Sequence, residues 1–127
     1  MSDSSGLQVV VDRGVTVVTL GEKYETLDEL KVEELSEPLL AVAGEATPPL
    51  LVVNLAHTRF FGSSFIALLF RTRTRLTPRN GKMAVCGLQG YCIEVMEVAH
   101  LNQLWHICPD SEEAVTVLLD GSEAASS

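Results

Sequence analysis

Two adjacent hydroxyls, Ser63 and Ser64, are the side chains of this sequence best placed to do chemistry. They follow the apolar run LLVVNL at residues 50–55 and a short loop, and they open a segment with helical periodicity. The start of a helix favours added negative charge, because its first backbone N–H groups lack partners and the helix dipole is positive there. A phosphate on either serine would bring a charge of about −1.5 to −2 to the surface. Serine is also a preferred helix cap, so a purely structural role stays open.

Enzymatic chemistry is poorly supported by the rest of the sequence. His57 lies on the loop before Ser63 and is the one residue that suggests a general base for that hydroxyl. No Ser-His-Asp arrangement, paired carboxylate motif, P-loop or G-x-G-x-x-G sequence accompanies it. We therefore expect a binding protein and not an enzyme.

Metal, redox and membrane chemistry are not indicated either. Cys86, Cys92 and Cys108 form no C-x-x-C pair, and the three histidines show no metal-ligand spacing. An odd number of cysteines is typical of reduced thiols in a cytoplasmic protein. The N-terminus does not resemble a secretion signal, and no apolar run approaches the ~18–20 residues of a membrane span. We expect a cytoplasmic protein with no metal, no cofactor and no membrane insertion.

The charge is acidic overall but unevenly distributed. The net charge is −8, yet the segment from Arg59 to Lys82 carries six Lys and Arg residues and no acid. An acidic protein repels phosphate backbones, so we expect no nucleic-acid binding. The basic segment is either a solvated face or a surface for an acidic protein partner.

The elements that must position the serines follow from the hydrophobic periodicity. Two β-branched runs predict a hairpin turning at Arg13-Gly14, and three further runs predict strands. Helical spacing predicts four helices, with a serine at the cap position of the second and Ile93 and Met96 turned inward in the third. Pro38 predicts a kink or a break in the first helix. The predicted strands are 7–12, 15–20, 50–55, 82–88 and 104–108, and the predicted helices run from Thr26 or Asp28 to Gly44, over 63–76, over 89–99, and from 110 or 111 to 119.

Alternation of strands and helices after a hairpin is typical of the α/β class. We therefore expect a mixed, mostly parallel sheet of four to five strands, with an N-terminal hairpin and about four helices. One domain is expected over residues 7–119, with flexible tails at 1–6 and 120–127.

The stretch around the serines resembles the signature of the STAS domain family, and in particular that of the anti-sigma-factor antagonists. Asn54-Leu55 match the strand end of that signature, and Phe60-Phe61 match its aromatic-apolar pair. Ser63 falls on the serine that is phosphorylated in the antagonists, and Ser64 matches the next hydroxyl. Weaker similarities follow in the family's order, so that the resemblance covers about residues 7–119. These further segments are Gly21-Glu22, 80–87, 99–105 and 110–114.

Three departures from the family pattern lie close to the serines. Gly62 and Tyr24 stand where the family has aspartates that bear on recognition of the serine, and Phe65 replaces a glycine. Two expectations therefore stay open. Either a divergent kinase phosphorylates Ser63, or this STAS module no longer takes phosphate.

The resemblance implies a regulatory protein–protein interaction domain. Its partners would be an anti-sigma factor that is also a GHKL-type serine kinase, with its own ATP and Mg²⁺, and a serine phosphatase that removes the mark. The alternative is a scaffold that binds other STAS modules, and a homodimer is a further expectation.

The surface expected to meet the partner surrounds Ser63 and follows the helix after it. Ile66 and Phe70 share a helical stripe beside Arg71, which is either a second buried side or an apolar patch with a cationic edge. The candidate partner-binding residues are Tyr24, His57, Gly62, Phe65, Ile66, Phe70 and Arg71.

Overall fold

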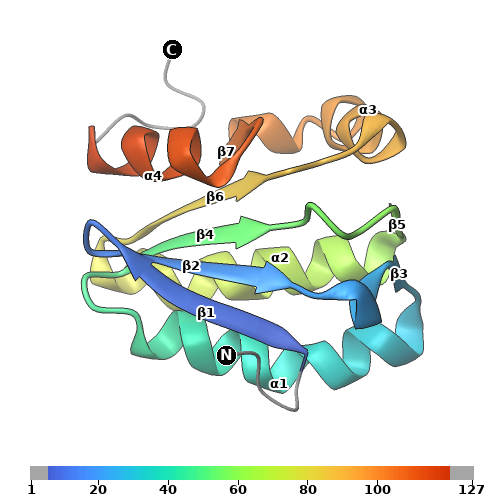
Figure 1. Ribbon diagram of the computed structural model, residues 1–127, viewed down its shortest axis with the longest axis horizontal. Coiled ribbons are helices and arrows are strands. Elements are labelled where there is room, and N and C mark those ends of the chain that lie inside the picture. Colours follow the sequence, from blue (N-terminus) through green and yellow to red (C-terminus); the bar gives the residue numbers. More distant parts are fainter. Residues whose placement is uncertain (1–5, 121–127) are drawn as a thin grey trace.

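Residues 6–120 are described by a computed structural model, in which helices cover both faces of a five-stranded sheet (Figure 1). The sheet order is β1-β2-β4-β6-β7, and β3 and β5 form a separate pair. The strands are β1 (Leu7–Asp12), β2 (Val15–Leu20), β3 (Thr26–Leu27), β4 (Leu50–Asn54), β5 (Phe60–Phe61), β6 (Lys82–Cys86) and β7 (His106–Cys108). The helices are α1 (Glu29–Glu45), α2 (Ser63–Leu76), α3 (Gly90–Val98) and α4 (Ser111–Leu119), with short 3-10 turns η1 (Glu22–Tyr24), η2 (Thr77–Arg79) and η3 (Leu101–Gln103).

The predicted α/β fold class is confirmed, including the mixed sheet. β1 and β2 pair antiparallel, whereas β2, β4, β6 and β7 pair parallel. Arg13 and Gly14 make the hairpin turn, and both have positive φ angles, 54° and 87°. A two-residue turn of this kind matches the right-handed twist of the strands that it joins.

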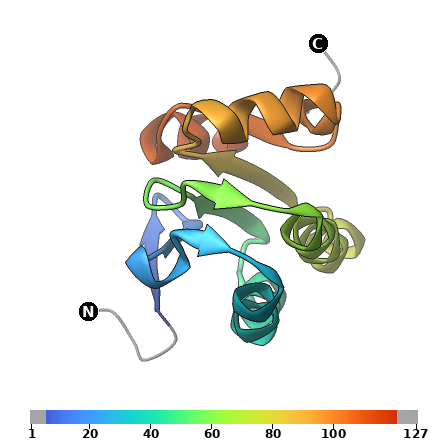
Figure 2. The same ribbon diagram turned by 90° about the vertical axis from the view of Figure 1, so that its right-hand side faces the viewer.

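The sheet has a large core on one face and a smaller one on the other. Figure 2 shows α1 and α2 side by side on the first face. Leu51 and Val53 of β4 belong to the first core, and Val52 belongs to the second, where α4 packs. Successive side chains of a strand point to opposite faces, so the LLVVN run of β4 is buried on both, as its sequence predicts.

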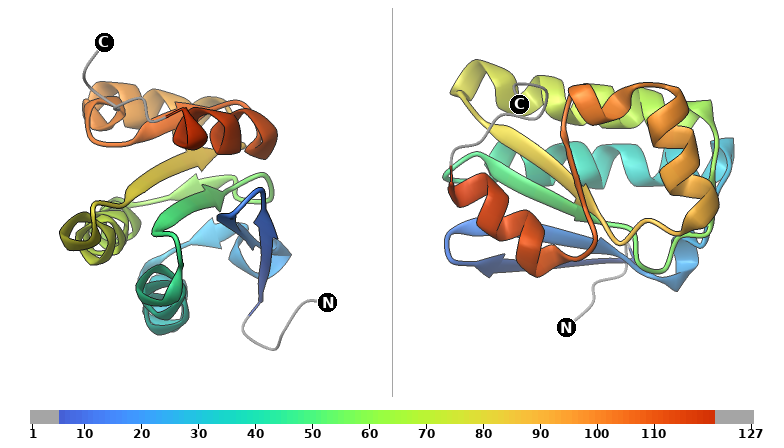
Figure 3. Two further views of the ribbon diagram at one scale, coloured as in Figure 1. Left: turned by 90° about the vertical axis from the view of Figure 1, so that its left-hand side faces the viewer. Right: turned by 90° about the horizontal axis from the view of Figure 1, so that it is seen from above.

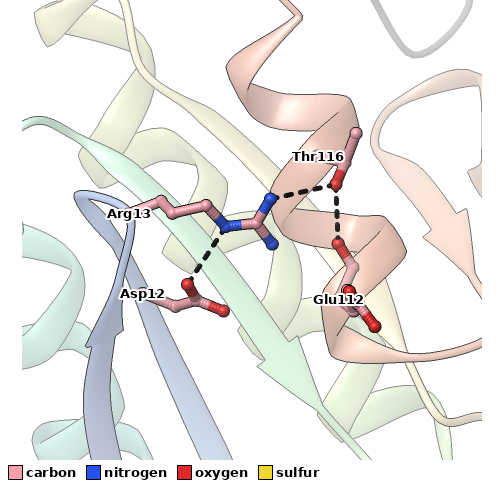
Figure 4. A network of polar contacts seen from close by, with 4 residues as sticks. All are labelled: Asp12, Arg13, Glu112 and Thr116. Atoms are coloured by element: carbon pink, nitrogen blue, oxygen red, sulfur yellow. Dashed lines mark hydrogen bonds and ion pairs between the residues drawn. The ribbon is translucent and has the colours of Figure 1, made fainter.

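A polar contact links the hairpin turn to α4 (Figure 4). The Arg13 Nε group donates to Asp12 Oδ1 at 3.1 Å, and its Nη1 group donates to Thr116 Oγ1 at 3.4 Å. The Thr116 hydroxyl itself donates to the Glu112 carbonyl at 3.0 Å. These groups are exposed, so the contact adds little to the stability of the fold.

Of the two outcomes expected at Pro38, a kink or a break of the first helix, the break does not occur. α1 runs unbroken over 17 residues, and Asp28 caps it by accepting from the Lys31 N–H at 2.9 Å. A proline inside a helix costs about 3 kcal/mol, but apolar side chains are buried on both sides of Pro38, and burying a valine or leucine side chain stabilises the fold by about 1.5–3 kcal/mol. Thr26 is not helical, since it pairs with Phe60 in the β3–β5 ladder.

The inward face of α3 includes Met96, as predicted, but not Ile93. Ile93 is 39% exposed, while Cys92 and Met96 are fully buried. Cys92 and Met96 form the i, i+4 pair that faces the core, and this orientation leaves Ile93 on the flank of the helix.

The ends of the chain add two local observations. Of the predicted tails, residues 1–5 and 121–127 lie outside the described residues. Gly6 and Asp120 are described, and their backbone groups are hydrogen-bonded to Gly21 and Thr116. Among residues 6–120, no helix combines the length and the apolar character needed to cross a bilayer.

The three thiols are free and buried, and two of them lie side by side. Cys86 of β6 pairs in register with Cys108 of β7. Burial, and secondly the neighbouring Cys108 thiol, raise the pKa of Cys86 from 9.0 to about 12. Burial also raises the pKa values of Cys92 and Cys108. All three groups are therefore neutral thiols at physiological pH, and thiols are poor nucleophiles.

We expect a disulfide reagent such as DTNB to modify the native protein at pH 8 at least about 10³-fold more slowly than the urea-unfolded chain, because reaction requires an opening of the fold. The unfolded Cys86 thiol ionises near pH 9.0 but the folded one near pH 12, so stability should also fall as the pH rises through that range. Absorbance at pH 8 measures the rate of thiol modification. Urea unfolding at several pH values measures the change in the free energy of unfolding. Rapid labelling of the native protein would contradict the first.

Candidate functional site

Ser63 is exposed at the first residue of α2, and Ser64 beside it is half-buried. Neither hydroxyl forms a hydrogen bond within the part of the chain that the structure describes. The N-cap is Gly62, whose carbonyl accepts from the N–H groups of Phe65 and Ile66 at 3.1 and 3.4 Å. The prediction of a serine at the cap is therefore wrong by one residue. The hydroxyl of Ser63 is not engaged in capping, which leaves it open to modification.

The loop that leads to Ser63 is fixed by backbone hydrogen bonds. Arg59 N–H donates to the Glu25 carbonyl at 2.8 Å, and the buried Thr58 hydroxyl donates to the Tyr24 carbonyl at 3.0 Å. Phe61 then pairs with Leu27 in the β3–β5 ladder. The serine pair thus lies beyond the carboxyl ends of β2 and β4, where function gathers in open α/β sheets, at the right of Figure 1.

A polar pocket of about 360 Å³ opens at the same end of the molecule. His57 lines it, and Arg59 Nε lies 3.0 Å from Glu25 Oε2 across its wall. Gln89 Nε2 donates to the Ala56 carbonyl at 2.9 Å. The full lining is Glu22, Glu25, Ala56, His57, Arg59 and Gln89. Ser63 lies outside this lining, so the structure does not join His57 and Ser63 into a base–nucleophile pair.

Two exposed aromatic rings stack near the serines. Phe60 and Tyr91 are 44% and 53% exposed, and their ring centroids lie 5.6 Å apart with an interplanar angle of 16°. Exposed aromatic side chains beside polar groups are typical of the residues that dominate protein interfaces. Sequence reasoning did not single out this pair as a contact site. Alternation along β5 shows that Phe60 and Phe61 face opposite ways. Only the fold shows that Phe60 is the exposed ring and that it stacks on Tyr91.

Two candidate partner-binding residues are buried, so neither offers an exposed side chain for a direct contact in this structure. Tyr24 is 1% exposed and Phe65 is fully buried. A methyl group on Gly6 would lie 3.0 Å from the Tyr24 ring, and the Phe65 ring packs 5.3 Å from that of Phe61. Tyr24 and Phe65, the two aromatic residues that depart from the family pattern, therefore fill the core and do not cover Ser63.

The remaining candidates keep access to solvent. Gly62 is half-buried, and a Cβ built on it would meet nothing within 4 Å. Ile66 is half-buried against the first core, and Arg71 is exposed. Phe70 is 40% exposed, with its ring edge-on to Trp105 at 5.4 Å.

Several exposed residues of α2 form a continuous surface with the aromatic stack. Ser63, Ala67 and Phe70 are exposed at helical spacing, so they lie on the same side of α2. The Phe60–Tyr91 stack lies near its beginning, because Phe60 is three residues before Ser63. We call this set the serine face: Phe60, Ser63, Ala67, Phe70 and Tyr91.

The fold and the serine face define a small α/β domain with the features of a protein-binding module. A STAS domain profile matches residues 3–114, and the chain belongs to the STAS domain family. The predicted resemblance to anti-sigma-factor antagonists is also confirmed.

Solved structures of anti-sigma-factor antagonists have a fold similar to that of this chain. The structure of an anti-sigma-factor antagonist (STAS) domain protein from Planctomyces limnophilus is 32% identical, with a TM-score of 0.83, over 89% of this chain and 97% of that one. An anti-sigma factor antagonist from Mycobacterium paratuberculosis is 24% identical, with a TM-score of 0.73, over 94% and 100% of the two chains. The antagonist SpoIIAA in its unphosphorylated form is 17% identical, with a TM-score of 0.64, over 91% and 99%. The last two similarities concern the fold alone. A comparison with curated proteins found none that matches.

Proposed function

We propose that this domain is an anti-sigma-factor antagonist that docks to a GHKL-type serine kinase acting as an anti-sigma factor, and that phosphorylation of Ser63 switches docking off. The observation that carries the proposal is the exposed Ser63 hydroxyl at the start of α2, without a hydrogen bond to residues 6–120. The 32% identity to a Planctomyces limnophilus antagonist supports the assignment of the partner class.

The position of Ser63 explains how a phosphate would act. Docking through the serine face would bury Phe60 and Tyr91 together with Ser63, and burying a dianion there without a cationic partner is costly. In the free domain the same phosphate would meet the unpaired N–H groups and positive dipole end of α2, which stabilise it. Both effects favour the dissociated state.

The proposal includes a cellular setting. Three free, buried thiols suit a reducing cytoplasm. ATP and Mg²⁺ would belong to the partner kinase, and a serine phosphatase would restore the docking form. The domain itself would act by binding and not by catalysis.

Intact mass spectrometry tests the switch residue. After incubation with ATP in a lysate of the source cells, we expect wild type and Ser64→Ala to gain one phosphate and Ser63→Ala to gain none. Gly62→Asp restores the family's aspartate in open space and should be phosphorylated faster than wild type. Failure of wild type to gain phosphate, or an equal gain by Ser63→Ala, would contradict the proposal.

A specific observation favours a second candidate function, a scaffold that is not phosphorylated and that binds other STAS modules or a second copy. The edge strand β1 exposes Val9, Val10 and Val11 by 44%, 48% and 68%. Edge strands normally carry charges or prolines that prevent pairing with another chain. A stable homo-oligomer in light scattering, together with no phosphate in the mass experiment, would favour the scaffold. A phosphorylated monomer would favour the switch.

A further inference from the structure

β1 is an edge strand whose outer side pairs with no other strand of residues 6–120. It stands at one end of the sheet order, and Figure 3 shows it, in blue, at the margin of the sheet. The opposite edge strand, β7, has three residues, whereas β1 has six. Short edge strands, and those that carry charges or prolines, resist pairing with another chain. β1 is long and carries neither a charge nor a proline from Leu7 to Val11, so its edge is open to a further strand.

The valines of β1 are exposed on both faces of the sheet. Val9 lies opposite Val18 of the first core, and Val10 lies opposite Val17 of the second. Directly opposed residues point to the same face, so Val9 and Val10 point to different faces. Val9, Val10 and Val11 are nevertheless 44%, 48% and 68% exposed, which shows that neither layer of helices covers this strand fully. A strand added beside β1 would shield apolar surface on both faces at once.

The hairpin determines which backbone groups of β1 point outward. In a hairpin closed by a two-residue turn, the residues that flank the turn exchange hydrogen bonds, and here these are Asp12 and Val15. Hydrogen-bonded and non-hydrogen-bonded pairs alternate along an antiparallel ladder, so Val10 also bonds to β2. The N–H and C=O groups of Val9 and Val11 therefore point away from β2, and an added antiparallel strand would give them partners.

We propose that the occupant of this edge is a second copy of the domain, whose β1 pairs antiparallel with β1 about a two-fold axis through Val10. The two sheets would then join into one. Val9 of each copy would lie opposite Val11 of the other, and each such pair would exchange backbone hydrogen bonds. The two Val10 side chains would meet at the centre. Gln8 would lie opposite Asp12 of the second copy, where an amide N–H can donate to a carboxylate oxygen.

The sequence of β1 favours a second copy over an unrelated strand. Its three valines are symmetric about Val10, so the two-fold arrangement places apolar side chains opposite apolar ones. No like charges are directly opposed, and such charges would destabilise the pairing. A two-fold contact also closes on itself, because it uses the free edge of both copies.

The dimer makes the edge contact of the scaffold candidate specific, but it does not rest on the switch at Ser63. β5, α2 and α3 supply the serine face, and β1 supplies none of it, so pairing through β1 leaves both serine faces exposed. A phosphorylated monomer would therefore overturn the dimer and keep the proposed switch. An unphosphorylated dimer would do the reverse.

Sedimentation velocity of the purified protein at several concentrations tests the association. We expect a reversible dimer with a Kd of about 100 μM or tighter. Each copy has a net charge of −8, so raising the salt concentration from about 50 to about 500 mM should tighten the dimer by screening their repulsion. A monomer up to about 1 mM would overturn the proposal and leave the edge to a different chain. A dimer that salt weakens would overturn it too, because ion pairs would then form the contact.

Two variants with the same change of net charge separate β1 from the rest of the surface. Val10→Lys would place two ammonium groups opposite each other and should weaken the dimer at least about tenfold. Leu30→Lys, at a residue of α1 that is 72% exposed, should change the Kd less than about twofold. Equal effects of the two variants would contradict a contact through β1. Urea unfolding checks the fold of each variant.

Disulfide cross-linking locates the contact, and it decides alone if Val10→Lys does not fold. Val10→Cys should cross-link two copies in oxidised glutathione, because Cα atoms of a directly opposed, non-hydrogen-bonded pair lie about 4.5 Å apart. Gln8→Cys is the matched control, exposed on the same strand, but the proposed register separates its two copies by about 13 Å. The native thiols are buried and should not cross-link wild type. Equal cross-linking of the two variants would overturn the proposed pairing.

Discussion

Ser63→Asp is expected to weaken binding to the cognate anti-sigma factor at least about 100-fold, a loss of ~3 kcal/mol, while Ser63→Ala stays within about threefold of wild type. The aspartate introduces a charge at an exposed position beside the Phe60–Tyr91 stack. Docking would have to desolvate that charge without a partner for it, whereas the alanine removes only a hydroxyl that bonds to nothing in residues 6–120.

Titration calorimetry with the purified partner measures the three affinities. Gln8→Glu serves as a matched control, because Gln8 is exposed on β1 and its replacement changes the net charge by the same amount. The control should bind like wild type. Equal affinities for Ser63→Asp and Ser63→Ala would rule out a serine switch, and equal losses for Ser63→Asp and Gln8→Glu would show a general charge effect instead.

Gly81→Ala is expected to destabilise the fold by about 3 kcal/mol or more, the largest stability effect we anticipate for a single added methyl group. A Cβ at Gly81 would overlap the Pro49 carbonyl oxygen and lie 2.9 Å from that of Leu76. Both are backbone atoms. The Pro49 and Leu76 carbonyls also accept hydrogen bonds from Lys82 and Gly81, so neither can move away without breaking the turn that leads into β6.

Urea unfolding followed by circular dichroism measures this effect, with Gly90→Ala as the matched control. Gly90 is the first residue of α3, and a Cβ there would meet nothing within 4 Å. The control should change stability by less than about 1 kcal/mol, in the stabilising direction that alanine favours in a helix. Equal stability of the two variants would show that the turn at Gly81 is not packed against Pro49 as described.

Several features of the fold could be predicted from the sequence because they depend on neighbouring residues. Arg13-Gly14 between two β-branched runs predicts the hairpin, and β1 and β2 have the predicted bounds. Helical periodicity from Ser63 to Leu76 predicts α2 without error at either end. Asp110 caps α4, as the acids that follow it suggest, by accepting from the Glu113 N–H at 2.9 Å. The exposed position of Ser63 follows from this local pattern together with the STAS resemblance.

Other features depended on segments far apart in the chain. Tyr24 and Phe65 were expected at the partner surface, but both fill the first core. Pro38 does not divide α1, because the burial of the residues around it outweighs a local penalty. The Phe60–Tyr91 stack joins β5 to α3, which are separate in sequence.

A pocket of about 370 Å³ between the last turns of α2 and the first residues of β6 and β7 shows the same limit. Its Arg73, Lys82 and His106 come from a helix and two strands, and the sequence indicated only that basic residues were concentrated between Arg59 and Lys82. By itself the sequence determined the order of the four helices and of the strands in the five-stranded sheet, the hairpin, the serine pair at the start of α2 and the family. Tertiary structure alone decided which aromatic rings are buried and which cations converge. Periodicity shows that a segment has two faces, but the side chains that cover each face are supplied by distant parts of the chain.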